Sequence, residues 1–124
     1  MTGSTSAREN VLKDKSYTFA IRIVKAYRHI VQEQKEFVLT KQLLRSGTSI
    51  GANVSEANQA QSKADFVSKL SIGLKETVET EYWLSLLRDT GFLTQSQANS
   101  LIEDCLELKR ILVSAIKTSK SSKI

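Results

Sequence analysis

The sequence contains no proline, and it has one cysteine, one histidine and five glycines among 124 residues. Proline breaks helices and glycine weakens them, so their scarcity favours a chain made almost wholly of helix. A single cysteine excludes an intrachain disulfide and a zinc site built from several cysteines, and it favours a reducing compartment. A single histidine excludes the paired Glu-x-x-His motifs of di-metal carboxylate bundles.

Long apolar runs are missing as well. No stretch approaches the ~20 apolar residues that a membrane-spanning helix requires. Residues 1–10 lack the apolar segment of a signal peptide. We therefore expect a cytoplasmic protein with no membrane partner. The length of the chain predicts one domain.

Helical spacing of apolar residues predicts two helices in the first half of the chain. The first begins at Asp14 or Ser16, either of which can act as its N-cap, and runs to about Glu33. The second begins at Thr40, the predicted N-cap, and runs to about Gln59. The predicted apolar face of the first helix consists of Ala20, Ile23, Val24, Tyr27, Ile30 and Val31.

Cap signals define two further helices in the second half. Ser62 can cap a third helix over residues 63–90, and Gly91 supplies the left-handed residue that ends it. The fourth helix opens at a capping box formed by Thr94 and Gln97. The predicted inward positions of the fourth helix are Ala98, Leu101, Ile102, Cys105, Leu108, Leu112, Ala115 and Ile116.

Short connections between these helices favour antiparallel neighbours. The predicted fold class is therefore all-α, an antiparallel up-down-up-down four-helix bundle over residues 11–118. Residues 1–10 are predicted to be a disordered N-terminal segment. Residues 119–124 are predicted to be a basic C-terminal tail.

The second helix has an unusual composition. Gly47 and Gly51 lie inside it, and each costs about 1 kcal/mol relative to alanine in a helix interior. This cost suggests that the backbone of a neighbouring helix approaches closely. The predicted apolar face is Leu43, Gly47, Ile50, Val54 and Ala57. A polar stripe of Arg45, Ser49, Asn53 and Glu56 lies beside it, and either internal hydrogen bonds or a partner would explain this stripe.

The same segment carries a resemblance to a known family. The pattern Arg45-Ser46-x-x-Ser49-Ile50-x-x-Asn53-x-x-Glu56 resembles the signature of the 23S rRNA intervening-sequence protein family, small bacterial proteins also called four-helix-bundle proteins. The resemblance continues through Gln42, Leu43, Phe66, Leu70, Tyr82 and Trp83. One departure is Ala57, where the family commonly has glycine, and it suggests that the helix continues to Gln59.

This resemblance implies an antiparallel four-helix bundle that assembles as a ring-shaped homopentamer. The family is distantly similar to the basic accessory protein of diversity-generating retroelements. That similarity implies RNA or DNA, and a reverse-transcriptase-like protein, as further partners. The shared motif contains no catalytic arrangement of residues.

The third helix has more apolar surface than one core requires. Ile72 and Trp83 fall outside its main apolar stripe, and Glu76 and Glu79 lie between them. A helix that is apolar on more than one face is buried on more than one face. We therefore predict that Ile72, Glu76, Glu79 and Trp83 form an oligomer interface.

The net charge of +5 permits nucleic-acid binding without requiring it. The candidate contacts form one cluster on the first helix and one on the fourth: Arg22, Lys25 and Arg28, and Lys109, Arg110 and Lys117. Ordinary solubility also explains both clusters. Because no aromatic residues alternate with these cations, binding is expected to depend on phosphates and to discriminate little between sequences.

Residues for catalysis are not evident. His29 has only Glu33 as a local acidic neighbour, Cys105 lies on an apolar seam, and no serine has a nearby base. We predict no enzymatic activity, no cofactor and no metal. Two hypotheses remain open: a homo-oligomer that binds RNA or DNA through basic surfaces, and a structural or protein-interaction scaffold with no nucleic-acid role.

Overall fold

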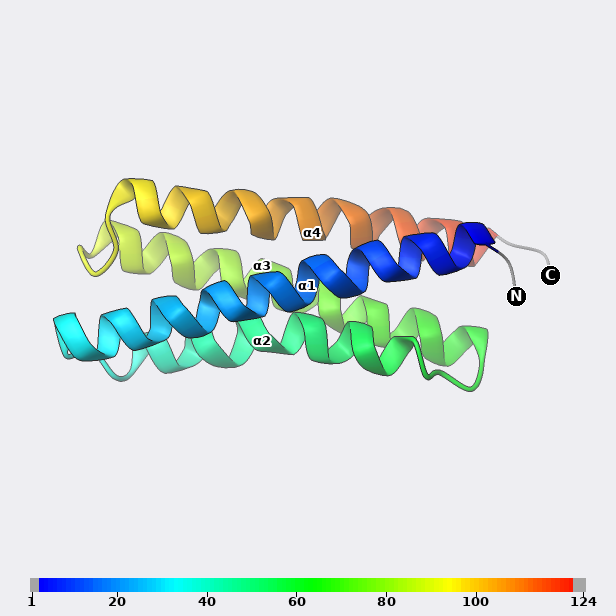
Figure 1. Cartoon of the computed structure of the whole chain (residues 1–124), viewed down its shortest axis with the longest axis horizontal. Helices are drawn as coiled ribbons and strands as arrows, with labels where there is room; N and C mark the ends of the chain where they lie inside the picture. The colour runs from blue at the N-terminus through cyan, green and yellow to red at the C-terminus, as the bar shows by residue number, and fades with distance from the viewer. Residues whose placement is uncertain (1–2, 122–124) are drawn as a thin grey trace.

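The structure is a computed structural model that describes the backbone of residues 3–121 and the side chains of residues 11–121. Its α-helices are α1 (Gly3–His29), α2 (Leu39–Ala57), α3 (Lys63–Asp89) and α4 (Gln95–Ser121), and a π-helical turn, η1 (Ile30–Gln34), continues α1. Consecutive helices run in opposite directions (Figure 1). Each helix packs on the next, and α1 packs on α4 to close the bundle. The predicted all-α four-helix bundle is confirmed.

Two helices are longer than the sequence suggested. α1 begins at Gly3 and not at Asp14 or Ser16, so residues 3–10, which were predicted to be disordered, are helical. α4 continues to Ser121, into the predicted tail. A nucleated helix gains one hydrogen bond for each added residue, and no proline stops either helix. The remaining residues of both predicted tails lie outside the described part of the chain.

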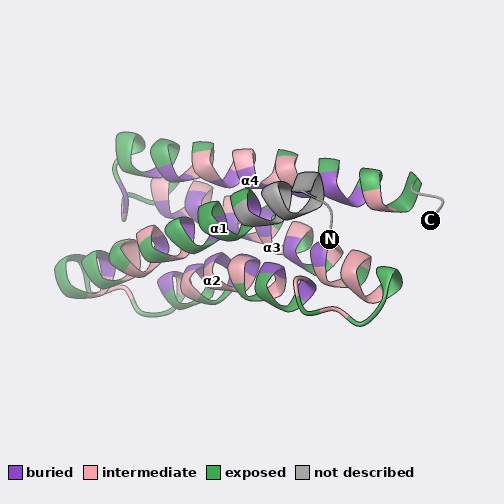
Figure 2. Ribbon diagram, turned by 45° about the vertical axis from the view of Figure 1, so that its right-hand side comes forward, coloured by how far each residue is buried: buried purple, intermediate pink, exposed green. Residues whose placement is uncertain are grey.

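The core runs along the bundle axis, where the helices turn their buried faces toward one another (Figure 2). The predicted apolar face of α2 is buried throughout, and that of α4 is buried except for Ile102, which is half-buried. Of the predicted apolar face of the first helix, only Ile23 and Ile30 are buried. Leu12 and Phe19 are also buried. Leu12 was missed because it precedes the predicted start of the helix, whereas Phe19 lies inside the predicted helix but was not assigned to its apolar face.

Glu36, and not Thr40, caps the start of α2. Its carboxylate accepts hydrogen bonds from the backbone N–H groups of Val38 (2.9 Å), Leu39 (2.9 Å) and Thr40 (2.8 Å). Thr40 lies inside the helix and is buried, so the predicted N-cap was wrong. Burial raises the pKa of Glu36, but the three N–H donors outweigh it and leave that pKa below its ordinary value.

The cap signals of the second half are confirmed. The Ser62 hydroxyl accepts from the Asp65 N–H (3.0 Å), and Gly91 has a left-handed φ of 87° after α3. Thr94 and Gln97 form a reciprocal capping box. The Thr94 N–H donates to Gln97 Oε1 (3.0 Å), and the Gln97 N–H donates to Thr94 Oγ1 (3.1 Å).

The end of α2 differs from the prediction. α2 ends at Ala57 and does not continue to Gln59. The Gln59 N–H bonds to the Glu56 carbonyl, and the Ala60 N–H bonds to the Ala57 carbonyl, both at 3.0 Å. These bonds reach back three residues, which tightens the chain into a turn. The turn therefore forms with Ala57, and not glycine, at the end of the helix.

The glycines of α2 lie against α1. A Cβ atom at Gly47 would stand 2.8 Å and 2.9 Å from two side-chain carbons of Ile23. A Cβ atom at Gly51 would stand 3.3 Å from the carbonyl oxygen of Ser16. At Gly73 on α3, by contrast, the nearest atom would be 3.7 Å away, on Asn53. The predicted close approach of a neighbouring helix backbone is confirmed for Gly51, whereas Gly47 packs against the side chain of Ile23.

Substitution of these glycines tests the contact. We expect Gly47→Ala to lower the free energy of unfolding by about 1–3 kcal/mol, because Ile23 would have to leave its position. Gly73→Ala is the matched control, and it should raise that free energy by up to about 1 kcal/mol, since alanine is the better helix former. Urea denaturation measures both changes. Equal effects of the two substitutions would contradict this account of the α1–α2 contact.

Candidate functional site

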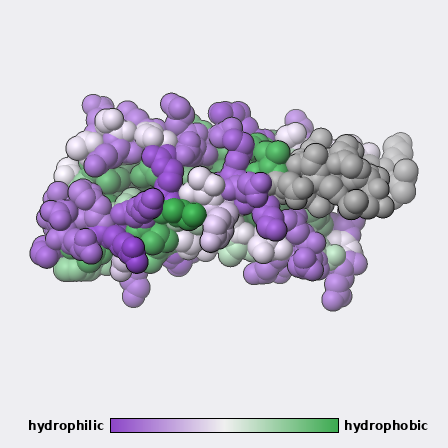
Figure 3. Space-filling view, viewed as in Figure 1, coloured by the Kyte–Doolittle hydropathy of each residue, from purple (hydrophilic) through white to green (hydrophobic). Residues whose placement is uncertain are grey.

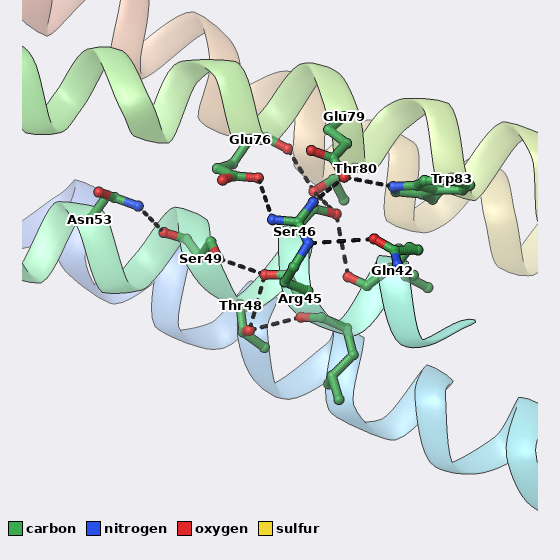
Figure 4. A network of polar contacts seen from close by, with 12 residues as sticks. Gln42, Arg45, Ser46, Thr48, Ser49, Asn53, Glu76, Glu79, Thr80 and Trp83 are labelled. Atoms are coloured by element: carbon green, nitrogen blue, oxygen red, sulfur yellow. Dashed lines mark hydrogen bonds and ion pairs between the residues drawn. The ribbon is translucent and has the colours of Figure 1, made fainter. Parts of the chain in front are cut away.

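A polar network joins α2 to α3 along one edge of the bundle (Figure 4). Arg45 on α2 forms ion pairs with Glu79 and, at 3.6 Å, with Glu76, both on α3. The guanidinium also lies 3.5 Å from Gln42 Oε1. The indole N–H of Trp83 donates to the same Glu79 carboxylate at 2.9 Å. Two of the predicted interface residues, Glu76 and Glu79, are therefore paired with Arg45 of their own chain. A third, Trp83, is bonded to Glu79.

The electrostatics of this network favour the charged forms. The hydrogen bond from Arg45 lowers the pKa of Glu79, the Trp83 indole lowers it further, and partial burial opposes both. The Arg45 side chain is 49% exposed and that of Glu79 is 36% exposed. Solvent screening therefore limits the stabilisation by this pair to about 1 kcal/mol or less.

A layer of buried hydroxyl groups lies beneath the network. Thr80 Oγ1 on α3 is 3.0 Å from Ser46 Oγ on α2 and 2.7 Å from the Glu76 carbonyl oxygen. Both hydroxyl residues are fully buried. Satisfied hydrogen bonds of this kind fix how two helices are aligned, because breaking one leaves a buried polar atom unpaired. The motif serine at position 46 thus has a structural role.

The rest of the polar stripe also bonds within the chain. Ser49 donates to the Arg45 carbonyl (2.6 Å), and the Asn53 amide donates to the Ser49 carbonyl (2.8 Å). Glu56 pairs with Lys69 of α3 at 3.4 Å, although its side chain is 61% exposed. Ile50, the remaining motif residue, is buried in the core. The stripe follows the rim of the α2–α3 contact and is only partly covered.

The outward face of α3 holds apolar residues beyond those predicted for the interface. The predicted interface residue Ile72 is 40% exposed, whereas Trp83 is half-buried against the core. Val78 (52% exposed) and Tyr82 (59% exposed) share the outward face with Ile72. Steps of three and four residues through Lys75 connect these positions, which is the spacing of neighbours on one helix face.

The predicted cations of α4 line one surface groove. Lys109, Arg110 and Lys117 border a groove of about 550 Å³, together with Leu106 and Val113. None of the three cations forms an ion pair with an acidic side chain among the described residues. Their charge is therefore available to an external anion.

The predicted cations of α1 lie near the other end of α4. Arg22 pairs with Asp104 of α4 at 2.5 Å and donates to Ser100 Oγ at 2.9 Å, so much of its charge is neutralised. Lys25 and His29 border a second groove, of about 350 Å³, between α1 and the start of α4. The structure does not bring the two cationic clusters into one site. Arg28 is exposed and lines neither groove.

The described side chains offer little for catalysis. Burial raises the pKa of the Cys105 thiol to about 12, and its Sγ lies 3.3 Å from the Thr77 carbonyl oxygen. Such a thiol is a poor nucleophile at neutral pH.

Over residues 11–121, no group of three or more His, Cys, Asp or Glu side chains is placed to hold a metal. Among the described helices, none combines the length and apolarity needed to cross a membrane.

Comparison with known proteins identifies the family. The sequence model of the family described as 23S rRNA-intervening sequence protein matches residues 8–114. The chain belongs to this family. The bundle is also similar to the crystal structure of a protein of unknown function of the S23 ribosomal protein family from Bacteroides thetaiotaomicron. The two chains are 58% identical over 89% of this chain and 98% of the other, with a TM-score of 0.87.

The comparison with curated proteins gives no match. Membership of the 23S rRNA-intervening sequence protein family confirms the resemblance carried by the segment from Arg45 to Glu56. In this chain, the described polar contacts of that segment are to its own helix and to α3, and its glycines pack against α1. The description of the family indicates no enzyme, and the solved relative is a protein of unknown function.

A double-mutant cycle measures the coupling across the network. Arg45→Ala and Glu79→Gln should each destabilise the protein, and together they should show a coupling of about 0.5–1 kcal/mol at pH 7. The pKa of Glu79 is lower in the folded chain than its ordinary value of 4.5. Its contribution is therefore complete above pH 4.5 and is lost as the pH falls through the folded-state pKa.

Chemical denaturation, followed by Trp83 fluorescence, measures the free energy of unfolding of each protein in this cycle at neutral and at acid pH. The coupling is calculated from these free energies. Glu56→Ala is a matched control on the same stripe, and its effect should stay within about 0.5 kcal/mol because that residue is exposed. A coupling that is zero at pH 7, or that persists unchanged in acid, would contradict the proposed pairing.

Proposed function

We propose that this chain is a non-enzymatic, homo-oligomeric protein that binds RNA or DNA through phosphate contacts in the basic groove of α4. The observation that carries the proposal is the groove itself, in which Lys109, Arg110 and Lys117 lie together without acidic partners among the described residues. The proposal places the protein in the bacterial cytoplasm. It includes no cofactor and no metal.

The chemistry of the groove suits phosphate and not bases. Arginine and lysine donate to phosphate oxygens, and a net charge of +5 attracts a polyanion over a longer range. Leu106 and Val113 supply apolar lining between the cations, but the described lining includes no aromatic ring that could stack on a base. Binding of this kind is tight only at low salt and is similar for different sequences.

Assembly would strengthen such modest contacts. One groove offers few cations, but a ring presents several grooves to one nucleic-acid strand, and this raises the overall affinity without any new contact. Five subunits are proposed from the family resemblance alone. The exposed apolar face of α3, with Ile72, Val78 and Tyr82, supports burial against another copy.

The alternative is a scaffold that binds only protein. The same apolar face of α3 favours it, because a partner such as a reverse-transcriptase-like protein could cover that face instead. The two candidates differ in how they respond to salt and to charge. Contacts through apolar side chains persist at high salt, whereas phosphate contacts weaken as salt rises.

The first test concerns assembly. Multi-angle light scattering at micromolar concentration should give the mass of a closed oligomer, with five chains expected, and that mass should not change on dilution toward nanomolar concentration. A particle of 13.8 kDa, the mass of one chain, would contradict the proposal. A stable oligomer of another size would refute the pentamer but would keep the assembly.

The second test concerns the groove. Lys109→Glu combined with Lys117→Glu should weaken binding of a generic single-stranded RNA at least tenfold at low salt. The slope of log affinity against log salt should fall by about 0.7–0.9 for each phosphate that the variant no longer neutralises. Fluorescence anisotropy of a labelled 20-mer, with a duplex DNA of the same length in parallel, measures both quantities.

Lys35→Glu combined with Lys41→Glu is the matched control, because it changes the net charge equally at exposed positions outside the groove. This control should lose much less affinity than the groove variant. Equal losses would show that only net charge matters. No complex at low salt with the intact oligomer would refute the nucleic-acid proposal and favour the scaffold.

A further inference from the structure

The outward face of α3 is the first of two surfaces that fit each other. Ile72, Val78 and Tyr82 project from it with 40%, 52% and 59% of their area exposed. The opposite face of α3 lies in the core, where Leu70, Leu84 and Leu87 are buried. A helix that is apolar on both sides is stable in water when both sides are covered.

A groove between α1 and α2 is the second surface. It has a volume of about 480 Å³, and small side chains line most of it: Ser16, Ala20, Thr48, Gly51, Ala52 and Ser55. Tyr17 stands at its edge and is 69% exposed. Hydrophobic surface emerges among the charged side chains along α1 (Figure 3), where Ile21 is 41% exposed.

The two surfaces are complementary in size and in charge. The groove is lined by small residues and can receive bulky side chains, and the α3 face presents bulky side chains. Lys13 and Asp14 both border the groove, and Lys75 lies on the α3 face. Asp14 and Lys75 have no ionic partner among the described residues, so these two charges can pair when the surfaces meet.

The positions of the surfaces determine the kind of contact. α1 and α3 are diagonal in the bundle, since each packs mainly on α2 and α4. The α1–α2 groove and the outward face of α3 therefore lie on different sides of the molecule. They are less than half a turn apart around the bundle axis. A row of copies docked head to tail would thus curve and could close into a ring.

We propose that the α3 face of one copy, centred on Tyr82, docks into the α1–α2 groove of a second copy. The contact is head to tail, so each copy uses its α3 face on one neighbour and its groove on the other. This inference rests on the proposed homo-oligomer and names its two surfaces. It replaces Trp83, which is bonded to Glu79 of its own chain, by Tyr82 as the anchor.

Complementary blocked variants test the pairing. Tyr82→Arg blocks only the α3 face, and Ala52→Arg blocks only the groove. Each variant alone should be a folded monomer by light scattering and circular dichroism. An equimolar mixture should form dimers, because one unblocked groove and one unblocked α3 face remain between the two variants. Gln61→Arg adds the same charge at an exposed loop position and should leave the wild-type mass unchanged.

The other outcomes separate the two proposals. A monomeric wild-type protein overturns both. An oligomeric wild type with one or both variants still fully assembled, or a mixture that stays monomeric, overturns the docking and leaves the homo-oligomer standing. If either variant fails to fold, Val78→Arg and Ser55→Arg block the same two surfaces and give the same readings.

Discussion

The contact between α2 and α1 at Gly47 and Gly51 is the constraint on which the rest of the structure depends. These glycines leave no room for a Cβ atom against Ile23 and Ser16 without displacing a neighbour, so α2 lies close to α1 in one rotational setting. That setting turns the adjacent residue Ser46 into the α2–α3 contact and places Arg45 at its rim. The segment from Arg45 to Glu56, which holds the motif and both glycines, thus determines how three helices are aligned.

α3 takes part both in this arrangement of helices and in the proposed assembly. Its inner face packs in the core, and its rim is held by Arg45 through Glu76 and Glu79. The polar groups of the rim are largely satisfied within the chain, and the outward face is left with exposed apolar residues such as Tyr82. An exposed apolar surface suits association with another copy. Burial of its apolar area lowers the free energy of the complex, and the complementary shapes of the two surfaces allow close packing.

Local signals in the sequence predicted much of the fold, whereas tertiary contacts escaped prediction. Ser62 and the Thr94–Gln97 box act through backbone groups three residues away, so sequence alone reveals them. The Glu36 cap follows Lys35, whose left-handed φ of 56° no pattern indicated. The environment of Trp83 depends on an ion pair between two helices. Sequence reasoning therefore recognised that α3 carries excess apolar surface, but it did not indicate that Tyr82 is more exposed than Trp83.

Cysteine cross-linking tests most directly the claim that α3 is covered on its outer side by another copy. In a Cys105→Ser background, Ala52→Cys and Tyr82→Cys would be placed in separate chains, mixed after mild unfolding, and oxidised. The account predicts disulfide-linked dimers containing one chain of each kind, and none when either variant is oxidised alone. Cross-links within one variant, or none in a mixture that light scattering shows to be oligomeric, would contradict it.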